Sequence, residues 1–279
     1  MSSQILLEPL LRFWDWLPVR GKVGVTVLAA AQLYWVWWFF TYYVRGPIAL
    51  YRGGVMGRDT TRTLDPVYSE PIDPVLLHYL EVSERKLTEL GFREPHRSTN
   101  RTTYPLTLVG SSLEHADHGD HALIIALRPT GTHVSNEPEN SMSFDSEFAD
   151  GVRLVTSNWQ GPRHWPDVPE TDHVRFPDVT DPAELYHLHR RRVDARHARA
   201  AQKKIWRGRT PEQRLVFTKR RHLDLYKHLV RCRYRRRTPD GLRPTLRGAM
   251  LGAWRHVFPW RAIDQWWQRR RARAVRRLA

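Results

Sequence analysis

The chain has 279 residues, one cysteine and a formal net charge of +16, because 45 lysine and arginine residues outnumber 29 acidic residues. The single cysteine, Cys232, excludes an intrachain disulfide and any redox or metal site built on a CxxC pair. The charge is concentrated at one end: residues 71–182 carry 9 basic and 18 acidic residues, whereas residues 183–279 carry 29 basic and 6 acidic residues.

An uncharged stretch of 22 residues, 23–44, is the most informative feature of the sequence. At about 1.5 Å per residue, a helix of this length crosses a hydrocarbon core of roughly 30 Å. Its second half is rich in Trp, Phe and Tyr, which favour the membrane interface, and Arg45 with Gly46-Pro47 is predicted to end it. Residues 1–22 are predicted to form an interfacial amphipathic leader. The sequence therefore predicts a single transmembrane helix at 23–44.

Two other interpretations of this stretch were weighed. A cleaved signal peptide is disfavoured because 22 residues precede the run and the apolar stretch continues for thirteen residues beyond Ala31. A core helix of a soluble protein is the second alternative, and the length of the uncharged run favours a membrane span over it.

The middle of the chain is predicted to be a small α+β domain at 73–160, preceded by a linker at 45–72. Asp73-Pro74 is a typical helix start, and Gly91 is predicted to end that helix, which would cover an antiparallel sheet. Four stretches have the composition of strands, and a fifth short strand is expected at Phe92–His96. The four are Tyr104–Val109, Ala122–Leu127, Met142–Phe148 and Val152–Ser157.

The last two of these strands predict a hairpin with a defined register. Apolar and polar residues alternate from Met142 to Phe148, and Asp150-Gly151 marks the turn. A three-residue loop with Gly151 in the left-handed conformation opposes Phe148 to Val152, and by the same count Ser146 to Leu154 and Phe144 to Thr156. This register places the apolar side chains of both strands on one face.

The rest of the chain divides into a Pro-rich extended segment at 161–180 and a basic helical region at 181–279. Asp181-Pro182 and Thr210-Pro211 are start signals for two helices, which we expect to form an antiparallel helical hairpin. The last forty residues are predicted to be short helices rich in Trp and Arg.

Few residues suggest chemistry. His115, His118 and His121 are candidate metal ligands, but their loop context favours a solvated hairpin tip, and the sequence predicts no cofactor. Asn158, Trp159 and Gln160 follow the last strand of the hairpin, where they would either line a cleft or simply lead into the Pro-rich segment. Because no catalytic motif is recognisable, enzymatic activity is the least favoured function.

The basic runs of the C-terminal region are the strongest functional signal after the apolar stretch. Only six basic residues are lysines, and arginine abundance is also typical of GC-rich bacterial coding, so it does not by itself indicate nucleic-acid recognition. Beside a membrane anchor, interleaved Arg and Trp suit docking on anionic lipid headgroups. A solvated or internally paired face is the main alternative. The predicted lipid or phosphate contacts are Arg235, Arg236, Arg237, Arg269, Arg270, Arg271, Trp266 and Trp267.

These observations predict a single-pass binding or scaffolding protein of a bacterial inner membrane, with anionic lipid as a partner. A membrane-anchored nucleic-acid-binding protein is the alternative, and a tethered enzyme is third. Four arginines within twenty residues after the stretch, against three basic residues before it, slightly favour a cytoplasmic C-terminal domain.

Overall fold

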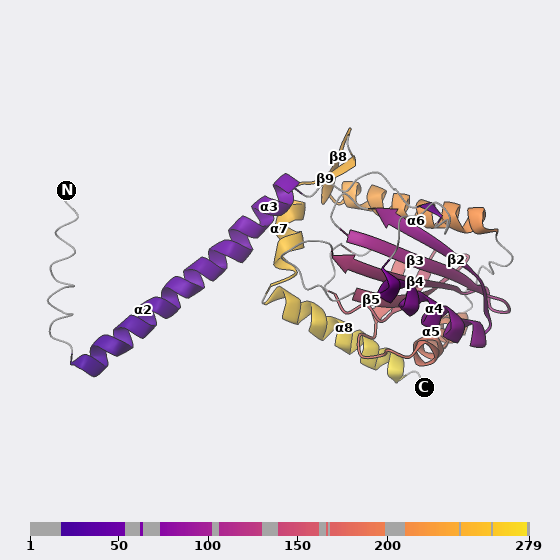
Figure 1. The fold of residues 1–279 in the computed structure, drawn as a ribbon, viewed down its shortest axis with the longest axis horizontal. Helices are drawn as coiled ribbons and strands as arrows, with labels where there is room; N and C mark the ends of the chain where they lie inside the picture. Colours follow the sequence, from indigo (N-terminus) through magenta and orange to yellow (C-terminus); the bar gives the residue numbers. More distant parts are fainter. Residues whose placement is uncertain are drawn as a thin grey trace.

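The computed structural model describes residues 18–53, 62–63, 73–101, 106–129, 139–161, 166, 168–198, 210–239, 241–257 and 259–277. Most of the predicted leader at 1–22 therefore lies outside the described residues. The fold is a mixed α+β arrangement with a seven-stranded sheet and one long apolar helix near the N-terminus (Figure 1). This agrees with the predicted fold class at that level.

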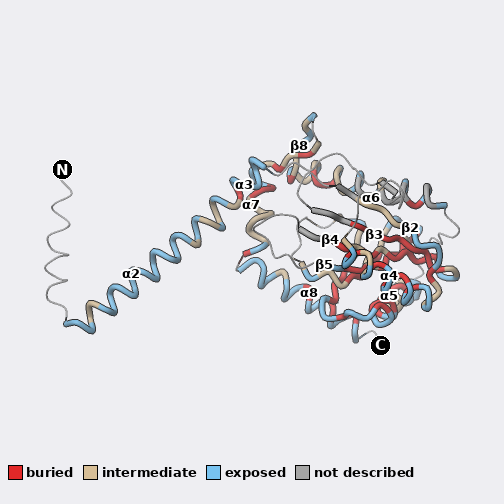
Figure 2. The backbone as a smooth tube through the Cα atoms, viewed as in Figure 1, coloured by how far each residue is buried: buried red, intermediate tan, exposed pale blue. Residues whose placement is uncertain are grey.

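The apolar helix runs without interruption through α2 (Val19–Phe39), a π-helical turn η1 (Phe40–Arg45) and α3 (Gly46–Gly53). It is long and apolar enough to span a membrane, and α2 has no buried residue, as the pale blue helix in Figure 2 shows. The prediction that Gly46-Pro47 ends the helix is wrong. The proline ring crowds the preceding turn of a regular α-helix, and the wider π-helical turn before Pro47 makes room for it, so the helix continues.

Seven strands form one sheet in sequence order, with every neighbouring pair antiparallel except the parallel pair β6 and β7. Each of the four predicted strands and the fifth short one overlaps an observed strand, but β2 and β3 extend well beyond their predicted ends at His96 and Val109. The segment of β7 was predicted only as extended, because its prolines mask the strand pattern. The bounds are β1 (Arg62–Thr63), β2 (Phe92–Arg101), β3 (Leu106–His115), β4 (His121–Pro129), β5 (Glu139–Glu147), β6 (Arg153–Ser157) and β7 (Thr171–Arg175).

The register of the β5–β6 hairpin is confirmed. Ser146 lies opposite Leu154 and Phe144 opposite Thr156. The Phe148 amide donates to the Val152 carbonyl at 2.8 Å, and Gly151 has a φ of 84°, in the left-handed region. Phe144 and Phe148 are fully buried as a result.

One face of the sheet is covered by α4 (Pro74–Glu89) and α5 (Pro182–His197), which lie beside the most deeply buried part of the chain (Figure 2). The Asp73 carboxylate accepts a hydrogen bond from the Val75 amide, which caps α4 as its sequence predicts. Leucines of α4 meet apolar side chains of the central strands in one cluster. Its members include Leu76, Leu80, Leu87, Phe92, Val109, Leu113, Ile124, Met142 and Phe144.

The opposite face of the sheet is polar, and α6 (Pro211–Arg231) lies over it. The Arg221 guanidinium makes a bidentate ion pair with the buried carboxylate of Asp145, which also contacts the His121 ring at 3.3 Å. The predicted hairpin of two helices is therefore wrong, because α5 and α6 lie on opposite faces. A carboxylate buried on the second face needs a cationic partner, which α6 provides.

The C-terminal region adds a hairpin of β8 (Arg235–Thr238) and β9 (Gly241–Pro244), then α7 (Leu246–Trp254) and α8 (Trp260–Arg276). The sequence did not predict this hairpin, because a run of arginines shows no alternation of apolar and polar residues. Helix α7 packs against α3, while α8 packs against β7 and α5 through Ala272 and Val275.

Candidate functional site

The three histidines weighed as metal ligands do not converge. His115 lies on the α5 face of the sheet, where its ring stacks on Tyr186 at 5.5 Å, and His121 lies on the opposite face beside Asp145. The His115 Nδ1 atom accepts the amides of Asp117 and His118, and burial, followed by the nearby His118, lowers the pKa of the His115 ring. Among the described residues no group of three ligand-type side chains is placed to hold a metal ion.

A buried polar network fixes α5 to the sheet. His189 lies between two hydroxyls, with Nε2 3.0 Å from Ser146 Oγ and Nδ1 3.0 Å from Thr156 Oγ1. Ser146 donates in turn to Asp120, which also accepts from Tyr186 at 3.0 Å. Burial and the Asp120 charge raise the pKa of Tyr186, which keeps its hydroxyl protonated.

This network resembles a catalytic cluster in composition but not in geometry. Ser146 lies between Asp120 and His189, whereas a nucleophilic triad needs the histidine between the other two. Ser146 is 2% exposed and His189 is 0% exposed, so a substrate has no access. We conclude that the network satisfies buried polar groups and positions α5.

The C-terminal region contacts the apolar helix through α7 and the β8–β9 hairpin. The indole N–H of Trp254 donates to the Tyr43 carbonyl at 3.3 Å, and the two rings lie 6.1 Å apart. Gly46 lies beside Ala253 of α7, since a Cβ atom added there would be 4.0 Å from the Ala253 Cβ atom, an ordinary van der Waals distance. This contact places α7 at the end of the apolar helix that adjoins the α+β domain.

Helix α8 carries an exposed aromatic face. Trp260, Ile263, Trp266 and Trp267 are 49%, 43%, 55% and 50% exposed. The Arg270 guanidinium lies over the Trp266 and Trp267 rings, at 5.6 Å and 5.7 Å from their centroids. Large apolar side chains that gather on one exposed helix face mark an interaction surface.

The aromatic face lies on the side of the domain from which the apolar helix extends. In Figure 1, α2 leaves the corner formed by α3 and α7 and runs past the side where α8 begins, while α6 lies on the far side. A bilayer around α2 would therefore face α8 rather than α6.

The predicted contact residues have different surroundings. The Arg235 guanidinium donates to the Leu242 carbonyl at 3.0 Å, so it stabilises the β8–β9 hairpin. Arg236 lies 6.0 Å from the ring of Tyr51 on α3, and Arg237 is exposed. Arg271 is exposed beside the aromatic face of α8, whereas Arg269 lines a cavity on the other side of that helix.

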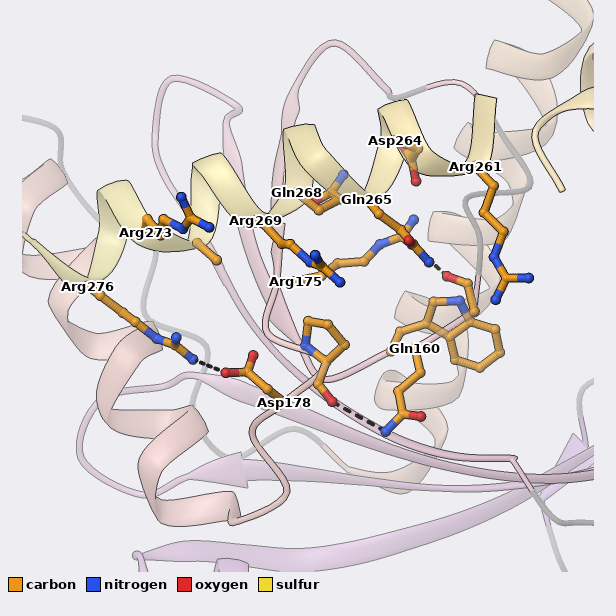
Figure 3. Close-up of a pocket in the computed structure, with 14 residues that line it drawn as sticks. Gln160, Arg175, Asp178, Arg261, Asp264, Gln265, Gln268, Arg269, Arg273 and Arg276 are labelled. Carbon is orange, nitrogen blue, oxygen red and sulfur yellow. Dashed lines mark hydrogen bonds and ion pairs between the residues drawn. The ribbon is translucent and has the colours of Figure 1, made fainter. Parts of the chain in front are cut away.

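The cavity beneath α8 has a volume of 660 Å³ (Figure 3). One wall is α8, and the other consists of the segments that follow the parallel strands β6 and β7, among them Trp159 and Gln160. A cleft is one of the two alternatives that the sequence leaves open for Asn158, Trp159 and Gln160; Trp159 and Gln160 line the cavity, and the sequence gives no sign of the opposite wall. Five arginines and two aspartates line it, Arg175, Arg261, Arg269, Arg273, Arg276, Asp178 and Asp264.

Two of the cavity arginines have fixed roles. Arg175 donates to the Gly161 carbonyl at 2.8 Å, and Arg276 pairs with Asp178. The hydrogen bond from Arg276 lowers the pKa of the Asp178 carboxyl, so this acid stays ionised. The five cations against two anions leave the cavity electropositive.

Comparisons with protein families, curated proteins and solved structures found no match to this chain.

Proposed function

We propose that this protein is a membrane-anchored binding or scaffolding protein whose C-terminal helices dock on anionic lipid beside its own anchor. The observation that carries this proposal is the contact between Trp254 and the Tyr43 carbonyl at 3.3 Å. It ties α7 to the end of the apolar helix, and α8 begins only six residues after α7 ends. With α2 in a bilayer, α8 is held close to the headgroups.

The composition of α8 suits that position. Trp side chains settle at the boundary between headgroups and hydrocarbon, and each basic residue near an anionic surface contributes about 1 kcal/mol. The aromatic face of α8 supplies the first type of residue, and Arg270 with Arg271 supplies the second. We assign this arrangement to a bacterial inner membrane, with the α+β domain in the cytoplasm.

The proposal is tested by hydrogen exchange of residues 260–276 in the full-length protein reconstituted in nanodiscs. We expect slower exchange with phosphatidylglycerol present than with phosphatidylcholine alone. Replacing Arg270 and Arg271 by Gln should remove most of this difference at low salt. Replacing Trp266 and Trp267 by Ser should weaken protection even at high salt, where charge is screened.

Two results would argue against lipid docking. Equal exchange in the two kinds of nanodisc would favour a solvated face. Binding of DNA or RNA by the detergent-solubilised protein, lost in the Arg270 and Arg271 variant, would favour the nucleic-acid alternative.

A further inference from the structure

We infer that the cavity beneath α8 binds a phosphorylated polyol, that is, a ligand with a phosphate group and neighbouring hydroxyls. The cavity faces away from the aromatic surface of α8, so this inference does not rest on lipid docking. It lies where the carboxyl ends of the parallel strands β6 and β7 meet at one edge of the sheet. Its volume of 660 Å³ is within the usual range for small-molecule sites.

Arginines of the α8 wall that make no ion pair indicate that the ligand carries a phosphate group. Within the described ranges, Arg261, Arg269 and Arg273 make no ion pair, in contrast to Arg276 with Asp178. Figure 3 shows Arg269 and Arg273 along one side of α8, above the segment that carries Asp178. Several guanidinium groups along one helix face recognise a phosphate more strongly than a single carboxylate, because each offers paired N–H donors.

A buried side-chain amide on the same wall indicates that the ligand also carries hydroxyl groups. Gln268 is 7% exposed, and its Oε1 atom has no hydrogen-bond partner among the described residues. The Oε1 atom has less than 1 Å² of accessible surface, so a ligand O–H reaches it once the Gln268 side chain rotates towards the cavity, and pairing this unsatisfied oxygen is then favoured. Asp264, one turn earlier on α8, offers a second acceptor in the cavity. Hydrogen-bond acceptors that lie among arginines suit a ligand that has both an anionic group and O–H donors.

The opposite wall offers a flat apolar surface. The Trp159 ring lies against Gly161, where an added Cβ atom would be 2.7 Å from the indole. Glycine therefore lets the ring close this side of the cavity. An indole face suits the carbon skeleton of a polyol, while the polar groups of the ligand turn towards α8.

The two sources of such a ligand are a soluble polyol phosphate and the headgroup of a lipid such as phosphatidylglycerol. The test is titration calorimetry on the full-length protein in phosphatidylcholine nanodiscs, which removes anionic bilayer docking. The probes are sn-glycerol 3-phosphate, inorganic phosphate and monomeric dihexanoyl phosphatidylglycerol. We expect glycerol 3-phosphate to bind more tightly than inorganic phosphate. Tighter binding of the short-chain lipid would assign the site to a headgroup, and the reverse would assign it to a soluble ligand.

Variants separate the two kinds of contact. Replacing Arg269 and Arg273 together by Gln should lower the binding affinity for every probe by at least about tenfold. Gln268→Leu should lower the affinity for glycerol 3-phosphate by about fivefold and leave the affinity for inorganic phosphate unchanged. The matched control replaces Arg220 and Arg231 by Gln, which removes the same charge from exposed positions on α6 but leaves the cavity and the aromatic face of α8 intact. The inference is overturned if no probe binds, or if the control weakens binding as much as the cavity variant does.

Discussion

The Trp254 indole donates its N–H to the carbonyl of Tyr43, four residues before Pro47. A residue 211 positions later in the chain supplies this donor. The hydrogen bond attaches α7 to the apolar helix close to a proline that does not end the helix.

Replacing Trp254 by Phe tests this attachment. The variant keeps an aromatic ring but loses the hydrogen bond, so we expect about 1 kcal/mol less stability for the contact between α7 and α3. Hydrogen exchange of residues 246–254 in nanodiscs measures the change. Trp260→Phe is the control, because Trp260 is 49% exposed and should alter nothing in α7. Equal exchange in the Trp254 variant and the parent would show that this hydrogen bond does not hold α7.

Phe144→Asp tests the hydrophobic core. Phe144 is fully buried, with its ring 5.6 Å from Phe92 and 5.1 Å from Tyr186. An unpaired charge at this position costs several kcal/mol against a typical stability of about 5–15 kcal/mol, so the α+β domain should unfold. Circular dichroism of the full-length protein in detergent measures the loss of folded structure on heating. Val75→Asp, at a position 54% exposed on α4, should melt like the parent.

The ion pair between Asp145 and Arg221 predicts a pH dependence of stability. Burial by itself would raise the pKa of the Asp145 carboxyl, but Arg221 and His121 together hold it well below its usual range. The folded-state pKa of Asp145 is below the unfolded value of about 4. The contribution of its ion pair to the free energy of unfolding is therefore complete above that pH. It is lost only as the pH falls through the folded-state pKa.

Urea denaturation of the parent and Asp145→Asn between pH 7 and pH 2 measures this dependence. The difference in unfolding free energy should shrink as the pH falls below about 4. Asp224→Asn, which removes an exposed carboxylate from α6, should leave the profile unchanged. A parent and Asp145 variant with parallel profiles down to pH 2 would contradict the account.

Membrane orientation is tested with thiol labelling in intact spheroplasts. Cys232 is the only native cysteine and is half-buried, so the better target is Val216→Cys on α6 in a Cys232→Ser background. Val216 is 65% exposed, and a cytoplasmic domain should be protected from an impermeant reagent until the cells are lysed. Labelling before lysis would place the domain on the outside.

The sequence predicts features that depend on local patterns. The β5–β6 register follows from alternation at Phe144 and Phe148 and from the turn at Gly151, and α4 starts at Asp73 because a cap acts within one turn. The α7 contact with α3 and the second wall of the cavity join segments far apart in the chain. Trp254 gives no local sign that its partner is Tyr43, and Gln268 gives none that it lines the same cavity as Trp159.

The most direct test of the central claim measures how deeply α8 lies in a bilayer. A fluorophore attached at Ile263→Cys, in the Cys232→Ser background, reports the aromatic face, and one at Val216→Cys reports the far side of the domain. Nanodiscs containing phosphatidylglycerol and a lipid with a nitroxide at headgroup level quench a label at the interface. We predict strong quenching at position 263, weaker quenching without phosphatidylglycerol, and little at position 216 in either case. Equal quenching at both positions, or none at position 263, would contradict docking of α8 on the membrane.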